Sequence, residues 1–350
     1  MNKESKEMEI NAATFHRTFQ DVQAEINSVV VGQSQAIEHL LTAVYAGGHI
    51  LLTGMPGLGR TLLVKTLAQV MGLEYRRLQF TPDLLPTDII GAEVLEGNHP
   101  GGERRFRFFK GPVFANMVLA DEINRSPSRT QSALLELMQE RQVTVGGQTY
   151  FLPKPFVLVA TQNTLDSEGV WPLGEAQADR FMMCIEQTYP DSESEGTMLD
   201  LTTGVRKSSA SQKTTPQAVI AMQQLAREVP VVPSVKDFAL QIVRSSRPGE
   251  AEEVKEATRD IRLGASPRAA QAMIMGAKVL ALARGRKHVS KDDIIEIARP
   301  VMAHRMILDF KAQAQGRDQK HVLEVLLSAM KTKAVPKVSF WTMELLKRPS

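Results

Sequence analysis

The feature that most constrains the fold is a glycine-rich stretch, GMPGLGRT, at residues 54–61. It follows an apolar run, HILLT at 49–53, and it leads into residues 60–71, whose apolar side chains have helical spacing. A strand, a glycine-rich loop and a helix in this order predict a phosphate-binding loop, in which glycines let backbone N–H groups face the phosphates. Gly72 is the expected cap at the end of the helix.

The loop matches the phosphate-binding motif at every fixed position except one. The residues expected to contact the nucleotide here are Gly54, Pro56, Gly57, Leu58, Gly59, Arg60, Thr61 and Leu62. The Thr61 hydroxyl is expected on Mg²⁺. The departure is Arg60, where the motif has lysine, because a guanidinium keeps the charge but is larger, planar and forked. Arg60 is either a tolerated variant, which we favour, or the mark of a nucleotide-binding scaffold that hydrolyses little.

A second apolar run, residues 117–120, ends in two carboxylates, Asp121 and Glu122. Asp121 is expected to hold the Mg²⁺ shell, mostly through water, and Glu122 to orient and deprotonate the attacking water. The alternative is an acidic pair that caps a loop after a core strand. The position of the pair, 60 residues after Thr61, favours the catalytic interpretation, because two independent motifs then predict one site.

Further apolar runs at 156–160 and 181–185 predict more buried strands between helical patterns, and residues 74–80 are expected to form another strand. Such strands imply an α/β fold with a parallel sheet that is covered by helices on both faces. Polar residues follow the run at 156–160, and Asn163 is the candidate for positioning the attacking water. A turn-forming asparagine is the alternative.

Two serine–proline pairs, Ser126-Pro127 and Ser266-Pro267, each predict a helix with serine as N-cap and proline first. Arg268 then lies in the first turn of the second helix, where the helix dipole disfavours a cation by roughly 0.3 to 1 kcal/mol. A phosphate or a nearby carboxylate would compensate it. Arg180, just before the last strand, is explained most simply by a salt bridge to a local acid.

With 350 residues, the chain is expected to form two domains. The expected divisions are an N-terminal extension (1–28), a nucleotide-binding domain (29–190), a linker with a short helix and a mobile stretch (191–216), a small helical lid (217–335) and a tail (336–350). Within the first domain, residues 142–155 predict a β-hairpin that turns at Gly146-Gly147.

Composition narrows the function classes. The formal charge of +3, from 42 basic and 39 acidic residues, argues against a dedicated nucleic-acid binder. The single cysteine, Cys184, excludes an intrachain disulfide and fits a reducing compartment. No run of about 18 apolar residues appears, so we expect no transmembrane segment and a soluble, cytoplasmic protein.

Residues 116–147 closely resemble the MoxR family of AAA+ ATPases, as do VVGQSQAIEHLLTAV, ATQN, WPLGEAQADRF and LGASPRA. The resemblance runs from about Val29 to His304. It implies an αβα nucleotide domain followed by a helical lid, with ATP and Mg²⁺ as cofactors and ATP hydrolysis as the activity.

By this resemblance, Val31 and Gly32 lie near the adenine, Asn163 is similar to the sensor 1 residue and Arg268 to sensor 2. Arg180 resembles an arginine finger that reaches the γ-phosphate of the neighbouring subunit. A finger of this kind implies a homo-oligomeric ring, commonly a hexamer, in which ATP brings Arg268 of the lid to the phosphate-binding loop.

The resemblance also implies a chaperone-like remodeller that activates a metalloenzyme or another client complex, with a partner that bears a von Willebrand factor A domain. Residues 81–110 resemble a helix-2 insert, and 142–155 a pre-sensor 1 hairpin. A DNA-translocating ring is the alternative: the hairpin has only Lys154 as a cation, whereas the insert carries Arg104, Arg105, Arg107 and Lys110 among phenylalanines. That cluster also fits a strand with one solvated face, and we expect no nucleic-acid partner.

Overall fold

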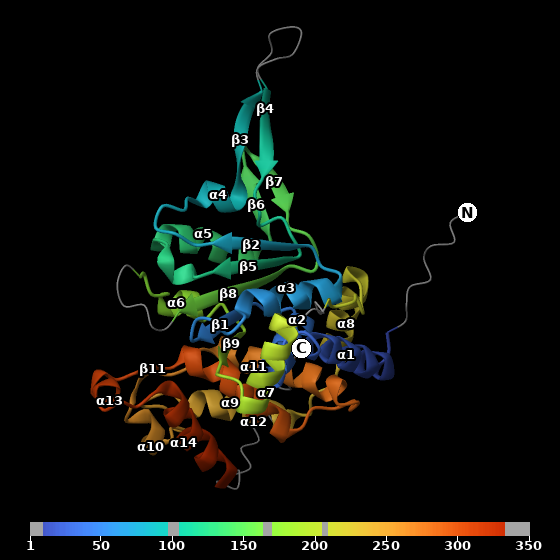
Figure 1. Cartoon of the computed structure of the whole chain (residues 1–350). Coiled ribbons are helices and arrows are strands. Elements are labelled where there is room, and N and C mark those ends of the chain that lie inside the picture. Colours follow the sequence, from blue (N-terminus) through green and yellow to red (C-terminus); the bar gives the residue numbers. More distant parts are fainter. Residues whose placement is uncertain (1–9, 97–104, 164–169, 205–208, 333–350) are drawn as a thin grey trace, which may run out of the picture.

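The computed structural model describes residues 10–96, 105–163, 170–204 and 209–332. Figure 1 shows a central sheet with helices around it, a helical region below it and two hairpins that project from the opposite end. The expected tail at 336–350 and Arg104 lie outside the described residues.

The central sheet has five parallel strands in the order β2-β5-β8-β1-β9. Their bounds are β1 Ile50–Gly54, β2 Tyr75–Gln79, β5 Met117–Asp121, β8 Val157–Asn163 and β9 Met183–Gln187. Around the sheet lie α1 Ala12–Asn27, α2 Ser34–Tyr45, α3 Arg60–Met71, α4 Pro86–Ile90, the 3-10 helix η1 Ile123–Arg125, α5 Ser128–Glu140, α6 Glu175–Ala178 and α7 Ser192–Thr203. All five expected strands are therefore present, in the predicted α/β arrangement. Four of them contain the apolar runs, whereas β2, with the sequence YRRLQ, is a mostly exposed edge strand.

The strands of the sheet divide their side chains between two cores. In β5, Met117 and Leu119 face one core with α1, α2 and α3, whereas Val118 and Ala120 face the other core with α5. This alternation follows from the two-residue period of a strand, and burial of both faces explains why the runs are apolar throughout. The first core continues without a break into the helical region, so the sheet and the helical region share one hydrophobic core.

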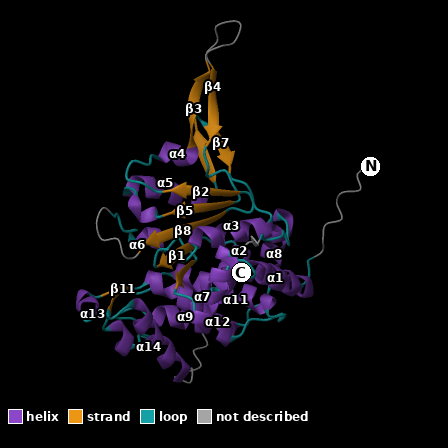
Figure 2. Ribbon diagram, in the orientation of Figure 1, coloured by secondary structure: helices purple, strands orange, loops and turns teal. Residues whose placement is uncertain are grey.

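The helical region follows the sheet in the chain (Figure 2). It comprises α8 Pro216–Glu228, α9 Pro233–Ser245, α10 Lys255–Thr258, α11 Pro267–Ala283, α12 Lys291–Met302, the 3-10 helix η2 Ala303–Arg305, α13 Phe310–Ala314 and α14 Gln319–Thr332. A small antiparallel pair, β10 Ile261–Leu263 and β11 Ile307–Leu308, was not predicted. Among the described helices, none has the length and apolarity that a membrane crossing requires.

One local prediction was wrong. Ser126 does not cap α5, because Pro127 is extended (ψ 152°) and is itself the N-cap of a helix that begins at Ser128. Residues 205–208 of the stretch expected to be mobile lie outside the described residues. After them, the amide of Lys213 donates to the carbonyl of Val70 at 2.8 Å, and Gln69 donates to the carbonyl of Ala210 at 2.6 Å. By contrast, Ser266 caps α11 as predicted.

Two antiparallel hairpins project together from the sheet (Figure 1): β3 Gly91–Glu96 with β4 Arg105–Lys110, and β6 Gln142–Val145 with β7 Gln148–Phe151. The second turns at Gly146 and Gly147, both with positive φ, as predicted. The rings of Phe108 and Tyr150 join the two hairpins, with centroids 4.5 Å apart.

Candidate nucleotide-binding site

The glycine-rich loop lies at the carboxyl edge of the sheet, between β1 and α3. Gly54 has φ 131°, and a Cβ there would meet the carbonyl oxygen of Gln187 at 2.4 Å. Gly57 and Gly59 have φ of 85° and 70°, with open space where a Cβ would be. The loop therefore requires glycine for its backbone turns, and it leaves the open side on which a phosphate can approach N–H groups.

The expected metal ligands meet beside this loop. The Thr61 hydroxyl lies 3.4 Å from Oδ2 of Asp121, and the hydroxyl of Thr161 donates to Oδ1 at 2.6 Å. Asp121 is buried at the end of β5. A hydroxyl and a carboxylate are oxygen ligands of the kind that Mg²⁺ prefers, so these residues fit the ion that the motif requires.

A cation that the sequence analysis did not single out also binds Asp121. Arg77, on the edge strand β2, donates to Oδ2 from Nε at 2.9 Å and from Nη2 at 2.7 Å. Its Nη2 also donates to the side chain of Gln79 at 2.5 Å. The expected metal ligand is therefore neutralised by a guanidinium.

Glu122 is held by donors on its backbone and on its side chain. Its backbone is left-handed (φ 58°), and its N–H donates to the Thr161 hydroxyl at 2.8 Å. The amide of Gln79 donates to Oε2 at 2.9 Å, and Nε of Arg125 lies 3.1 Å from the same oxygen. Positive φ in a glutamate is uncommon and marks a constrained position. Among the described residues both donors contact Oε2, so the other carboxylate oxygen of Glu122 can accept a proton.

Arg60 turns toward backbone carbonyls. Its Nη2 donates to the carbonyl of Met55 at 3.0 Å and its Nη1 to that of Gln162 at 3.4 Å, while the buried Nε has no hydrogen-bond partner among the described residues. Burial lowers the pKa of Arg60, and the nearby carboxylates of Asp121 and Glu122 oppose this shift. The guanidinium therefore bridges the glycine-rich loop and the end of β8.

The other residues expected around the nucleotide lie close to the loop. Asn163 ends β8 directly opposite Gly54 of β1. Gly32 packs against the segment after β9, where a Cβ would meet Pro190 at 2.7 Å, and Gln33 donates to the carbonyl of Thr188 at 3.0 Å. Val31 and Gly32 thus lie next to the segment that follows β9, the strand paired with β1.

Arg180 and Arg268 are not brought to the loop. Arg180 leads into the amino end of β9, whereas the loop follows the carboxyl end of the adjacent parallel strand β1. Arg268 donates to Asp179, with Nη1 3.3 Å from Oδ2, so the compensating anion is a carboxylate. The expected salt bridge of Arg180 to a local acid is absent from the described residues. The two arginines therefore flank Asp179 on a part of the molecule remote from the glycine-rich loop.

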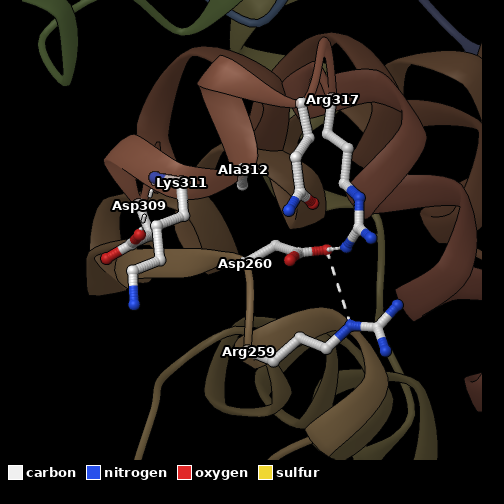
Figure 3. Close-up of a pocket in the computed structure, with 7 residues that line it drawn as sticks. Arg259, Asp260, Asp309, Lys311, Ala312 and Arg317 are labelled. Atoms are coloured by element: carbon white, nitrogen blue, oxygen red, sulfur yellow. Dashed lines mark hydrogen bonds and ion pairs between the residues drawn. The ribbon is translucent and has the colours of Figure 1, made fainter.

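A pocket of about 270 Å³ in the lid is separate from this site (Figure 3). It is lined by Arg259, Asp260, Asp309, Lys311, Ala312, Gln315 and Arg317. Asp260 pairs with Arg317 and lies 3.7 Å from Nε of Arg259. Asp260 thus forms an ion-pair cluster with two arginines on the wall of this pocket.

Comparison with known proteins agrees with this geometry. Residues 49–183 match the ATPase family associated with various cellular activities (AAA), and residues 255–325 match the AAA lid domain. The chain is 40% identical to Chaperone MoxR1 of Mycobacterium tuberculosis, over 90% of this chain and 81% of that protein. It is 31% identical to Protein MoxR of Paracoccus denitrificans, over 86% and 92%. A solved structure from Cytophaga hutchinsonii, described as a candidate ATPase, superimposes with a TM-score of 0.83 at 41% identity, over 91% and 95% of the two chains.

Proposed function

Because the chain belongs to the MoxR family of AAA ATPases, we propose that it hydrolyses Mg·ATP at the glycine-rich loop and works as a homo-oligomeric ring. The observation that carries this proposal is the cluster at the carboxyl edge of the sheet. There, Thr61 and Asp121 lie 3.4 Å apart, and Glu122 is the next residue after the metal ligand. These are the groups that phosphoryl transfer to water needs.

Each residue of the cluster has a defined part in the reaction. Backbone N–H groups of residues 54–61 bind the phosphates, and Thr61 and Asp121 hold the metal shell. A bound Mg²⁺ would neutralise charge on the phosphate oxygens. Glu122 takes the proton of the attacking water, with its carboxylate oriented by Gln79 and Arg125, while Asn163 positions that water.

The ring is proposed from the place of the two lid-side arginines. Arg180 lies remote from its own glycine-rich loop, at the start of the neighbouring strand. A finger at this position serves the γ-phosphate of an adjacent subunit. Arg268 is held next to Arg180 through Asp179 and then faces the same neighbouring subunit. This proposal replaces the expectation that ATP brings Arg268 to the glycine-rich loop of its own subunit. A hexamer is the proposed assembly.

We propose that the ring remodels a client or partner, with the paired hairpins as the contact. Phe106 and Phe151 are 71% and 73% exposed on them, which suits a protein surface. Two insert cations lie over nearby rings of this chain, Arg107 over Phe109 and Lys110 over Phe114, and this disfavours a DNA-tracking role. The relative from Mycobacterium tuberculosis is named a chaperone. A partner with a von Willebrand factor A domain remains part of the proposal.

Steady-state ATP hydrolysis across a series of protein concentrations tests this function. We expect turnover per subunit to rise with concentration, because each site needs a neighbour, and to vanish in Glu122→Gln. Glu136→Gln, an exposed glutamate of α5, is the matched control and should match the parent chain. A turnover independent of concentration and of Arg180 would refute the ring, and turnover that survives Glu122→Gln would refute the catalytic site.

A further inference from the structure

A buried arginine of the lid, Arg305, donates hydrogen bonds to the residues on both sides of Arg180. The side chain of Arg305 is 2% exposed, and it comes from η2, more than a hundred residues after Arg180 in the chain. Its Nε donates to Oδ1 of Asp179 at 2.9 Å, and its Nη2 donates to the carbonyls of Asp179 at 3.1 Å and Phe181 at 2.6 Å. Its Nη1 donates to the carbonyl of Met182 at 3.0 Å.

This arrangement fixes the backbone of residues 179–182 by their own carbonyls. His304 adds a contact from its ring Nε2 to the carbonyl of Phe181 at 3.1 Å. A buried guanidinium is costly unless all its donors are used, so loss of any one acceptor is resisted. Arg180 stands between two residues whose carbonyls accept from the same guanidinium, which fixes the backbone at Arg180.

The same carboxylate joins the second arginine to this arrangement. Asp179 accepts from the Ser266 hydroxyl at 2.7 Å, from Arg305 and from Arg268. Burial raises the pKa of Asp179, but bonds from Ser266 and Arg305 outweigh it and hold that pKa below its usual value. A charged Asp179 therefore ties the N-terminus of α11, with Arg268, to the turn that carries Arg180.

We infer that Arg305 and Asp179 are positioning residues that fix Arg180 and Arg268 as one unit offered to the neighbouring subunit. The inference rests on the proposed function, in which Arg180 acts in trans. It adds that the backbone carrying Arg180 is attached to the lid of its own subunit and moves with it. A lid movement in one subunit is then passed, through the carbonyls of residues 179–182, to hydrolysis in the next subunit. Both residues lie at the amino end of β9, away from the glycine-rich loop of their own subunit.

Mixed rings test this inference, because they separate a subunit's own site from the finger that it offers. Subunits with Glu122→Gln cannot turn over, so all turnover in a mixture with the parent chain comes from parent sites. When parent and Glu122→Gln subunits mix randomly at a one-to-one ratio, about half of the activity of parent rings at the same total concentration remains. Glu122→Gln with Arg180→Ala leaves about a quarter, because a site without its finger loses at least about a thousandfold in rate.

We expect Glu122→Gln with Arg305→Met, and Glu122→Gln with Asp179→Asn, to leave about a quarter as well. The control is Glu122→Gln with Arg286→Met, which removes an ion pair to Asp293 inside the lid and should leave about half. In Arg305→Met alone, the affinity for ATP should be unchanged while turnover falls. Damage to the nucleotide-binding site would lower both. If Arg305→Met fails to fold, Asp179→Asn, at a partly exposed side chain, is compared with the control in its place.

The inference is overturned if mixtures with the Arg305 and Asp179 variants keep about half of the activity, like the control, while the mixture with the Arg180 variant keeps about a quarter. In that case the finger in trans still stands. If the Arg180 variant itself leaves about half, the trans finger of the proposed function is lost, and this inference is lost with it.

Discussion

The guanidinium of Arg77 lies on the carboxylate of Asp121, with Nε and Nη2 at 2.9 and 2.7 Å from a single oxygen. Thr61 approaches the same oxygen at 3.4 Å. The residue expected to hold the Mg²⁺ shell is thus already paired with a cation. Because one carboxylate oxygen cannot serve both cations at full strength, Arg77 and the metal compete for Asp121.

We therefore expect Arg77→Met to lower the Mg²⁺ concentration at which ATP binding is half-maximal. A half-exposed ion pair contributes about 0.2–1 kcal/mol, which corresponds to a shift of at most about fivefold. Titration of Mg²⁺ against a fluorescent ATP analogue measures this midpoint. Arg76→Met, the adjacent exposed arginine that pairs with Glu74 instead, should leave it unchanged. A midpoint that rises in Arg77→Met would mean that Arg77 assists metal binding.

The sheet and the loop could be predicted because their signals are local. The helix after the loop runs from Arg60 to Met71 as predicted, since Gly59 and Gly72 at its two ends are both left-handed. Continuous apolar runs identified the buried strands. The start of α5 was placed too early, because an extended proline and a first helical proline share the same φ.

The residues that the sequence analysis missed lack such a local signal. Arg77 and Gln79 alternate along an edge strand and look like its solvated face, while their partners follow about 40 residues later. The parallel register that sets Gln79 opposite Asp121 brings them together. Arg305 meets Asp179 across 126 residues, and only an isolated arginine within the apolar stretch MAHRMIL hinted at it.

Arg60→Lys is expected to raise kcat by roughly tenfold, with a smaller change in the Kd for ATP. In the parent chain the guanidinium donates to the carbonyls of Met55 and Gln162, and it would have to leave these bonds to pair with a phosphate. A lysine ammonium is compact and reaches between the β- and γ-phosphates. Single-turnover hydrolysis and equilibrium ATP binding separate the two quantities.

The control for this substitution is Lys65→Arg, an exposed lysine on α3, for which no change is expected. An equal kcat in Arg60→Lys and the parent chain would show that Arg60 already does the work of the lysine. It would remove the scaffold interpretation at the same time.

The paired hairpins are expected to loosen when Phe108 is truncated. The Phe108 and Tyr150 rings, 4.5 Å apart, are the aromatic contact between the hairpins. Such a pair contributes about 0.5–1.5 kcal/mol, so Phe108→Ala should speed amide hydrogen exchange in residues 142–151 by about two- to tenfold. Phe109→Ala, on the other face of β4, serves as control because its ring is 47% exposed. Equal exchange in the two variants would show that the hairpins are independent.

The buried imidazole of His49 makes the stability of the sheet depend on pH. Its Nδ1 accepts from the N–H of Leu158 at 3.0 Å, and its Nε2 lies 3.2 Å from the carbonyl of Met138, so the neutral ring satisfies both partners. Burial lowers the pKa of His49 to about 4 from the ordinary 6.5. His304 is shifted in the same direction, to about 3, again chiefly by burial.

The folded protein becomes less stable as the pH falls, because the unfolded chain takes up the proton of His49 at a higher pH than the folded chain does. The unfolded chain binds the proton of His49 near pH 6.5 and the folded chain only near pH 4, so the contribution is complete above pH 6.5 and is lost as the pH falls toward 4. Each such histidine adds a slope of at most about 1.4 kcal/mol per pH unit to the free energy of unfolding. Denaturant unfolding between pH 7.5 and about 4.5 measures this slope.

His49→Asn retains an acceptor for Leu158 and lacks the titrating ring. We expect it to be less stable at pH 7.5, because the edge contact with Phe156 is lost, and to lose less stability than the parent chain as the pH falls. His321→Asn, an exposed histidine of α14, should keep the slope of the parent chain. If His49→Asn keeps that slope too, the pH dependence arises elsewhere, with the buried ring of His304 as the next position to replace.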